Sequence, residues 1–253
     1  FAAMHADGGR VPVTLPAWIQ PLTASLIVAF VIRVFVALTF PNTYAADEIF
    51  QSYGQAHRLV FGHGVVPWEY QVGLRSWFIP LLLAGPMEVA HWLVPNPLAG
   101  LALARLGLCV ASLPIVWCAV KWGERFHGVR GGWIVGMFTA LWPDLWLFAP
   151  HPLAAVLAAD VLVPALYLVE SCRGQNGLKP VVWAGVLLGF AFALREQLAP
   201  AIAVAGTLLC GKDMKRWRFA VSAAALPVLL FGLLDWFTWG QPFRSFWLNV
   251  YLN

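Results

Sequence analysis

Charge is scarce in this sequence. Asp, Glu, Lys and Arg make up 11% of the 253 residues, and 60% of the residues are hydrophobic. A soluble domain carries roughly 25% charged residues, and a folded chain of this size still exposes much of its surface. The deficit excludes an ordinary soluble domain and predicts a multi-pass helical membrane protein. Fourteen tryptophans agree with this, because Trp collects at membrane interfaces.

The sequence also lacks the cysteine spacings of metal and redox sites. Cys109, Cys118, Cys172 and Cys210 form no CxxC pair, so we expect buried thiols. A net charge of +4 could indicate nucleic-acid binding, but the basic residues form no clustered patch, and we predict no nucleic-acid partner. Residues 1–16 are poor in apolar residues, so we predict no cleavable signal peptide there.

Long apolar runs are abundant. They predict helices over 17–40, 77–94, 99–120, 131–149, 153–170, 181–194, 198–210 and 219–239. The connections 121–130, 171–179 and 211–218 carry all four lysines and five arginines, which places them in the cytoplasm. That orientation requires 77–94 to lie within or along the outer leaflet without crossing. Residues that spoil a lipid-facing span favour this position: Pro80, Gly85, Pro86, Glu88 and His91.

We therefore expect one transmembrane domain over 1–253, with a cytoplasmic N-terminus and about seven crossings. The outer loop would run from about 41 to 98, with 195–197 and 240–253 on the same side. The chain stops at "NVYLN" without a terminal feature. We expect it to be the N-terminal half of a longer enzyme.

The predicted outer loop gathers ionisable residues, and Asp47 and Glu48 open it at the membrane boundary. The stretch 45–62 has helical period, with two opposite stripes: Asp47, Gln51, Gln55 and Arg58, and Ile49, Phe50, Tyr53, His57 and Phe61. An amphipathic helix on the membrane surface would show the same pattern, and acids at a helix N-terminus are favourable for its dipole alone. These structural interpretations stand beside a functional one.

The segment "DEIFQSYGQAHRLVFGHGVVPWEYQVGLRSWFIP" resembles the first luminal loop of the mannosyltransferases that use polyprenyl- or dolichyl-phosphate-mannose, within the GT-C superfamily. The matching positions are Asp47, Glu48, Phe50, Gln51, Ala56, His57, Gly62, Trp68, Glu69, Leu74, Arg75, Ser76 and Pro80. The segment "LLDWFTWGQPFRSFWLNVYLN" is similar to a second family segment at Asp235, Gly240 and Asn249. The chain departs from the family pattern at Ala45, Ala46, Gly54 and Pro67.

The resemblance implies an all-α GT-C type membrane bundle with a helical outer-face first loop. It also implies an inverting transfer of a sugar, with mannose favoured, from a polyprenyl-phosphate donor to a lipid-linked or cell-envelope glycan acceptor. Asp47 is the expected general base, and Glu48 would orient it or hold a neighbouring arginine. Because an arginine fork suits phosphate oxygens, we expect Arg75, then Arg195 and Arg58, at the donor phosphate. Each could instead pair with Glu69, Glu196 or Asp235.

The remaining expectations concern substrate, metal and host. The predicted substrate-binding residues are Gln51, His57, Trp68 and Glu69. Asp47 and His57 are too far apart in sequence to share a metal without a bend, and a monophosphate leaving group needs metal less than a diphosphate does. We predict no metal and no cofactor. His151 is either structural or in contact with the acceptor.

A non-catalytic polyprenyl-lipid-binding or transport protein on the same scaffold is the alternative function. The two hypotheses differ in whether Asp47 faces a cavity shared with Arg75 or Arg195. An Ala-, Trp- and Arg-rich chain with few lysines favours a bacterial relative. We therefore expect a bacterial inner membrane with a periplasmic site, or the ER membrane with a luminal site in a eukaryote.

Overall fold

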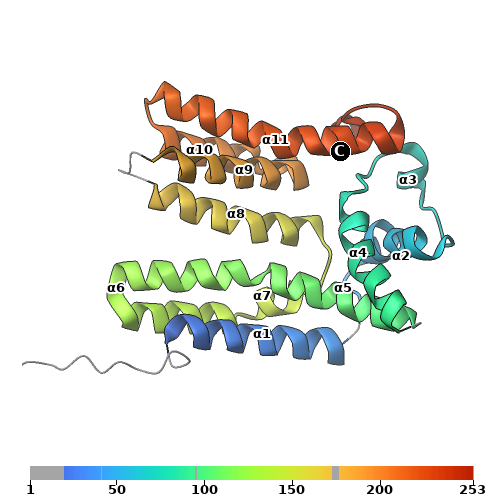
Figure 1. Ribbon diagram of the computed structural model, residues 1–253, viewed down its shortest axis with the longest axis horizontal. Coiled ribbons are helices and arrows are strands. Elements are labelled where there is room, and N and C mark those ends of the chain that lie inside the picture. Colours follow the sequence, from blue (N-terminus) through green and yellow to red (C-terminus); the bar gives the residue numbers. More distant parts are fainter. Residues whose placement is uncertain (1–19, 41, 95, 173–176, 253) are drawn as a thin grey trace, which may run out of the picture.

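The computed structural model describes residues 20–40, 42–94, 96–172 and 177–252, and every regular element in these ranges is a helix. Long helices run side by side and form a bundle (Figure 1): α1 (Pro21–Thr39), α6 (Leu113–Leu141), α8 (Ala154–Ser171), α9 (Leu178–Leu194), α10 (Ala199–Cys210) and α11 (Met214–Trp239). Helix α5 (Pro97–Ala111) leads into α6, and α7 (Pro143–Phe148) follows it.

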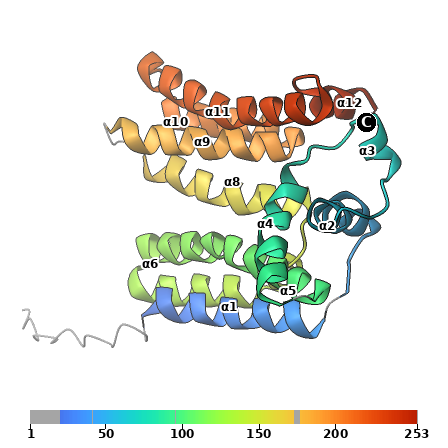
Figure 2. The same cartoon turned by 45° about the vertical axis from the view of Figure 1, so that its right-hand side comes forward.

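A group of shorter helices gathers at one end of the bundle (Figures 1 and 2). We call it the cap, and it consists of η2 (Glu48–Tyr53), α2 (Gly54–Phe61), α3 (Trp68–Val72) and α4 (Phe78–Leu93). The short elements η3 (Glu196–Leu198) and α12 (Arg244–Leu252) follow α9 and α11. In Figure 2, α12 lies beside α3.

Helix α1 exposes apolar side chains and buries polar ones, which is the reverse of the pattern in a soluble protein. Its exposed face is apolar, with side chains 52–57% exposed at Ile27, Val31, Phe35 and Leu38. Ser25 and Arg33 are instead fully buried. In lipid, apolar side chains face outward, and small or polar residues meet the neighbouring helices. The pattern identifies α1 as a membrane helix.

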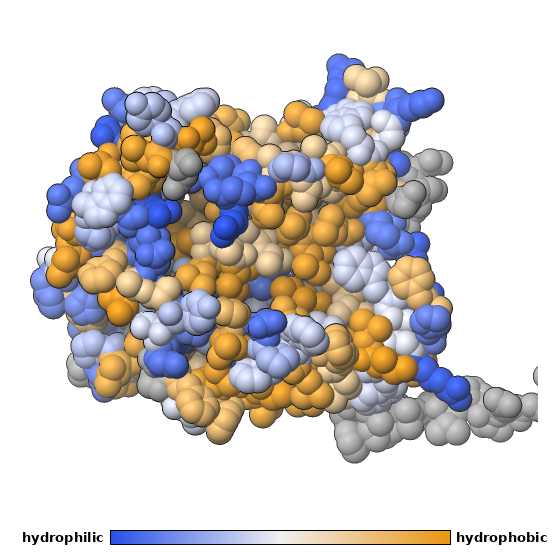
Figure 3. All heavy atoms as spheres, turned by 180° about the vertical axis from the view of Figure 1, so that it is seen from behind, coloured by the Kyte–Doolittle hydropathy of each residue, from blue (hydrophilic) through white to orange (hydrophobic). Residues whose placement is uncertain are grey.

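Four helical segments in the described ranges are long and apolar enough to cross a membrane: Pro21–Thr39, Pro97–Leu141, Ala154–Ser171 and Met214–Trp239. Phe78–Leu93, Leu178–Leu194 and Glu196–Cys210 are shorter apolar helices. Seen from behind, hydrophobic residues cover most of the middle of the molecule, and hydrophilic residues gather toward its two ends (Figure 3). The multi-pass membrane fold is confirmed; the count of about seven crossings stays a prediction.

Helix α6 shows where the predicted boundaries were wrong. We expected a polar connection over 121–130, but the helix continues through it and reverses at His127 and Gly128, whose backbones are not helical. The two arms come close, since a Cβ on Gly123 would stand 2.3 Å from the carbonyl oxygen of Gly131. Small residues permit such contact between membrane helices. The expected helix 131–149 also ends early, because Pro143 starts the separate α7.

Helix α4 runs across the direction of the bundle helices in both views (Figures 1 and 2). This agrees with the prediction that 77–94 does not cross beside them. The cap is fixed to the bundle by a hydrophobic cluster that joins it to α5 and α8: Tyr53, Ala56, Leu83, Met87, Ala104, Leu108 and Leu157. The Ser52 and Tyr53 hydroxyls donate to the carbonyls of Pro152 (3.2 Å) and Pro150 (2.9 Å).

The expected continuous helix over 45–62 is wrong in its first half, because η2 is a π-helix. A π-turn fits one more residue per turn and shifts the phase of the side chains that follow. The predicted polar stripe is therefore split. Gln55 is fully buried, and its amide donates to the carbonyls of Phe50 and Val65, both at 3.0 Å.

The four cysteines are free and buried, as predicted. The predicted helix start at residue 17 lies outside the described residues, and so do residues 1–16.

Candidate active site

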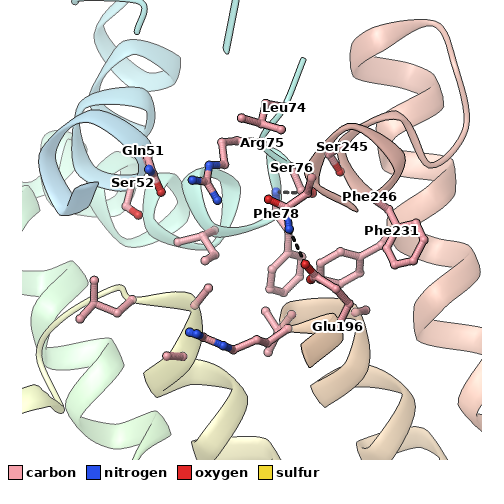
Figure 4. A pocket seen from close by; sticks show the side chains of 18 of the residues that line it. Gln51, Ser52, Leu74, Arg75, Ser76, Phe78, Glu196, Phe231, Ser245 and Phe246 are labelled. Atoms are coloured by element: carbon pink, nitrogen blue, oxygen red, sulfur yellow. Dashed lines mark hydrogen bonds between the residues drawn. The ribbon is translucent and has the colours of Figure 1, made fainter. Parts of the chain in front are cut away.

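A cavity of about 440 Å³ lies where the cap meets the ends of α8, α9 and α11. Its polar lining includes Asp47, Gln51, Ser52, Arg75, Ser76, Arg195, Glu196, Asp235, Ser245 and Asn249. Figure 4 shows Gln51 and Ser52 on one wall and Glu196, Phe231 and Phe246 on another, with Arg75 between them. Segments about 200 residues apart in sequence therefore meet around one space, as ligand sites commonly require.

Asp47 stands immediately before η2 and lines the cavity. Its side chain is exposed and does not cap the helix. Within the described chain its carboxylate has no hydrogen bond or ion pair, so both oxygens are available to a ligand. Its position directly before η2 is compatible with the helix-dipole interpretation, while its free oxygens are compatible with the functional one.

Glu48 has the opposite environment. Its side chain is fully buried, and Oε2 lies 2.7 Å from Nδ1 of His151. Oε1 accepts the backbone N–H groups of Tyr44 (2.8 Å) and Ala45 (3.1 Å). Burial alone would raise the pKa of Glu48. The hydrogen bond and charge of His151, together with the two backbone donors, hold that pKa below its usual value of 4.5.

These contacts bear on two roles for which the sequence left alternatives open. Glu48 does not line the cavity and holds no arginine, so the structure does not place it among groups that touch a substrate. Instead, it ties the backbone just before Asp47 to the segment that precedes α8. His151 is 5% exposed and binds Glu48, and it is also absent from the cavity lining.

Glu69 joins the two sides of the cap that reach the cavity. Its Oε1 accepts from Gln51 Nε2 (3.1 Å), and from Arg75 Nε (3.1 Å) and Nη2 (2.8 Å). Glu69 is 9% exposed and is not part of the cavity lining, whereas Gln51 and Arg75 are. Among the described residues, Arg75 Nη1 has no partner, so one edge of the guanidinium remains available.

Arg195 reaches the cavity from the opposite side, at the end of α9. Its side chain is exposed, and no described residue pairs with it. The neighbouring Glu196 instead accepts hydrogen bonds from the side-chain amides of Gln197 and Asn249. The expected alternative, in which Glu196 neutralises an arginine, is not what the structure shows.

Three predicted site residues lie outside the cavity lining: Arg58, His57 and Trp68. Arg58 donates to Gln55 and lies 5.8 Å from the ring centre of Trp77. His57 packs against Phe61 and meets the carbonyl of His63, and Trp68 is 60% exposed. The phase shift at η2 turns α2 away from the cavity. The predicted phosphate role of Arg58 and the substrate roles of His57 and Trp68 therefore lack support from the geometry.

Sequence reasoning gave no site role to four cavity residues: Asp235, Ser245, Glu196 and Asn249. Oδ2 of Asp235 accepts from the backbone N–H (2.9 Å) and the hydroxyl (2.6 Å) of Ser245. The second resembling segment could have indicated three of them, because it contains Ser245 and has Asp235 and Asn249 at matching positions.

One side of the cavity is apolar, with lining residues Phe78, Phe192, Val228, Phe231 and Phe246. Phe78 and Phe231 stack with ring centres 4.5 Å apart, which joins α4 to α11. The space thus combines an apolar side with an unpaired carboxylate, two guanidinium groups, amides and hydroxyls. Such a set can accept a proton, hold an anion and hydrogen-bond a polyol. No group of three His, Cys, Asp or Glu side chains suited to a metal occurs within the described ranges.

These features define an all-helical membrane protein with a cavity of polar and apolar lining at one end, between the bundle and the cap. A model of the Alg9-like mannosyltransferase family matches residues 25–253, and the chain belongs to that family. The predicted resemblance and the predicted all-α GT-C type fold are thus confirmed.

Several relatives are similar over shorter stretches. GPI mannosyltransferase 3 of Trypanosoma brucei brucei is 34% identical over 106 residues, which is 38% of this chain and 18% of that protein. GPI mannosyltransferase 3 of Drosophila melanogaster is 42% identical over 72 residues, 25% of this chain and 12% of the relative. GPI alpha-1,2-mannosyltransferase 3 of Mus musculus is 32% identical over 82 residues, which is 32% of this chain and 15% of the relative. The match covers less than a fifth of each relative, and no solved structure matches.

Proposed function

We propose that this chain forms the catalytic cavity of a membrane glycosyltransferase. The enzyme transfers mannose from a polyprenyl-phosphate donor to a glycolipid or cell-envelope glycan, with inversion at the sugar carbon. Family membership supports the reaction class, and the names of the relatives support mannose.

One observation carries the proposal: the unpaired carboxylate of Asp47 lines the same cavity as Arg75 and Arg195. A transferase with this donor needs a proton acceptor for the attacking hydroxyl and cations for the departing phosphate. Asp47 supplies the first, while Arg195 and the free edge of Arg75 supply the second. Holding both substrates in one space provides the proximity on which the rate depends.

The reaction balances with these groups alone. The acceptor oxygen attacks C1 of the mannosyl group and forms the new glycosidic bond. The bond from C1 to the phosphate oxygen breaks, and its electron pair leaves on polyprenyl phosphate. The hydroxyl proton passes to Asp47, which acts as the general base. The gain in negative charge on the phosphate is stabilised by guanidinium donors.

The apolar side of the cavity fits the lipid part of the donor. Phe78, Phe192 and Phe231 offer a surface for isoprenoid carbons next to the arginines. A soluble nucleotide sugar would gain nothing from this surface. The mixed lining therefore supports a lipid-linked donor.

The alternative is a polyprenyl-lipid-binding or transport protein without transfer activity. Binding alone requires the arginines and the apolar side, but leaves no task for a free carboxylate beside them. The unpaired state of Asp47 favours the enzyme. We further propose that the cap and cavity face the periplasm in a bacterium, or the ER lumen in a eukaryote.

The test is sugar transfer by membranes that contain the full-length protein. Radiolabelled polyprenyl-phosphate-mannose and a nucleotide-linked mannose are offered in parallel, in the presence of an inhibitor of polyprenyl-phosphate-mannose synthase, so that the nucleotide sugar is not converted to the lipid donor. We expect label in the glycan or glycolipid fraction from the lipid donor alone. Label from the nucleotide sugar alone would overturn the donor assignment. Tight donor binding without transfer would favour the binding protein.

A further inference from the structure

The corner between α11 and α12 makes direct contact with the cap segment that carries Arg75. The indole N–H of Trp239 donates to the carbonyl oxygen of Arg75 at 3.2 Å. Arg244 donates twice to the carbonyl oxygen of Val72, from Nε (3.1 Å) and Nη2 (2.9 Å). These residues are 164 and 172 positions apart in sequence. We call this set of contacts the clasp.

Gly73 leaves the space in which the clasp closes. Its backbone is left-handed (φ +82°), and a Cβ there would stand 2.6 Å from Arg244 Nε and 3.3 Å from a ring carbon of Trp239. A side chain at this position would therefore be both strained and in collision. The rings of Tyr70, Trp77 and Trp239 pack around the same point, with centres 4.9–6.2 Å apart.

The α11–α12 corner is itself firmly held. The buried carboxylate of Asp235 binds both the N–H and the hydroxyl of Ser245. Phe243 adopts a left-handed backbone (φ +58°), and its ring covers Gly232, where a Cβ would stand 2.3 Å from the ring. A non-glycine residue persists in that conformation only where its surroundings fix it. The corner is thus a rigid support from which the clasp reaches the cap.

Arg75 is consequently fixed at two points. Glu69 holds its guanidinium, and Trp239 holds its backbone carbonyl. Two fixed points leave the side chain of Arg75 little freedom on the wall of the cavity that it lines. Pre-organised donors bind an anion more tightly than mobile ones, because less side-chain entropy is lost on binding.

We propose that Trp239 and Arg244 are positioning residues that aim Arg75 at the phosphate of the lipid donor. The proposal rests on the proposed function and deepens it. It explains the second family-like segment, whose Asp235 and surrounding aromatics otherwise have no part in the reaction. The clasp acts on phosphate binding through Arg75, and neither Trp239 nor Arg244 touches the substrate.

The experiment measures equilibrium binding of polyprenyl phosphate and of polyprenol to the full-length protein in nanodiscs. Trp239→Phe keeps an aromatic side chain, with a smaller ring, and removes the N–H donor. We expect it to weaken polyprenyl phosphate binding about 3- to 10-fold, which corresponds to one hydrogen bond. Polyprenol binding should stay unchanged. Trp236→Phe is the matched control, because Trp236 is 58% exposed on the same helix.

A double-mutant cycle with Arg75→Gln separates positioning from general stability. If the clasp acts through Arg75, Trp239→Phe should change phosphate binding less than about 2-fold in the Arg75→Gln background. Equal effects in both backgrounds, or equal loss for polyprenol, would overturn the clasp proposal while wild-type transfer upholds the function. A wild-type protein that binds polyprenol and polyprenyl phosphate equally would overturn both.

Discussion

At the scale of single residues, the adjacent acids Asp47 and Glu48 have different environments. Asp47 is exposed on the cavity without a partner, and Glu48 is fully buried with both oxygens occupied. An available carboxylate suits a base, whereas a saturated one suits a support. The backbone bonds from Tyr44 and Ala45 to Glu48 fix the segment that presents Asp47.

Glu48 predicts a pH dependence of stability. Because its folded pKa is lowered, the carboxylate stabilises the fold above its unfolded pKa of about 4.5, and this contribution is lost as the pH falls through the folded value. Glu48→Gln should reduce stability by about 1–3 kcal/mol at neutral pH. The melting-temperature gap to wild type should narrow below about pH 4.5. Glu88→Gln, at a carboxylate that accepts only from Trp92 among the described residues, is the control. A pH-independent gap would contradict this.

At the scale of elements, the π-turn of η2 decides which cap residues reach the cavity. Gly54 closes this turn, and its N–H donates to the carbonyl of Ile49. A Cβ on Gly54 would stand 2.6 Å from that same oxygen. The departure from the family pattern at position 54 therefore has a local structural cause, because a side chain is incompatible with this turn.

Gly54→Ala should displace η2 and move Asp47 relative to the two arginines. We expect at least about 100-fold lower transfer, since misplaced catalytic groups lose that order of rate. Binding of polyprenyl phosphate should change little, because neither arginine is on η2. Gly107→Ala in α5 is the control, as nothing lies within 4 Å of its added Cβ. Transfer rates and donor affinity measured on both variants would check this; full transfer by Gly54→Ala would contradict it.

At the scale of the whole molecule, the bundle buries two ionisable side chains, Arg33 and Asp160. Arg33 of α1 is fully buried, and its three guanidinium nitrogens have no hydrogen-bond partner among the described residues. It interacts electrostatically with Asp160 of α8, and both line a second cavity of about 240 Å³. The lining of this cavity is mostly apolar, and Arg33 and Asp160 are among its few polar residues.

Replacing either Arg33 or Asp160 alone should lower the free energy of unfolding more than replacing both. Arg33→Met or Asp160→Leu alone leaves a buried charge uncompensated, with an expected loss of about 3–5 kcal/mol. The double variant should recover part of that loss, so the effects should not add. Thermal unfolding in detergent measures this. Strictly additive changes would show that the two residues are independent.

Most of the fold could be predicted because a protein surface that contacts lipid must be apolar, and this requirement is visible in the composition. Few charges and long apolar runs specify helices in a membrane. The segment 77–94, predicted not to cross, forms α4, which lies across the direction of the bundle helices. The connection within α6 was predicted too long, because helical hydrogen bonding does not require apolar residues where water or headgroups are near. Polarity marked 121–130 as a loop, while the actual turn involves only His127 and Gly128.

The site was only partly predictable, because some of its contacts join residues that are far apart in sequence. The family-like motif brought forward Asp47, Gln51 and Arg75, which do line one cavity with Arg195. The environment of Glu48 depends on His151, which is 103 positions away. Helical periodicity could not show that α2 faces away, because the π-turn depends on packing at Gly54. Contacts of this kind leave no local sequence pattern.

The most direct test of the account compares Asp47→Asn with wild type under single-turnover conditions, using saturating polyprenyl-phosphate-mannose and the full-length enzyme. Asp144→Asn is the control, since Asp144 is also exposed but lies outside this cavity. We predict unchanged donor affinity and a transfer rate about 10²–10⁴-fold lower for Asp47→Asn, as expected for loss of a general base. Wild-type transfer rates in Asp47→Asn would show that another group accepts the proton and that Asp47 is not the general base.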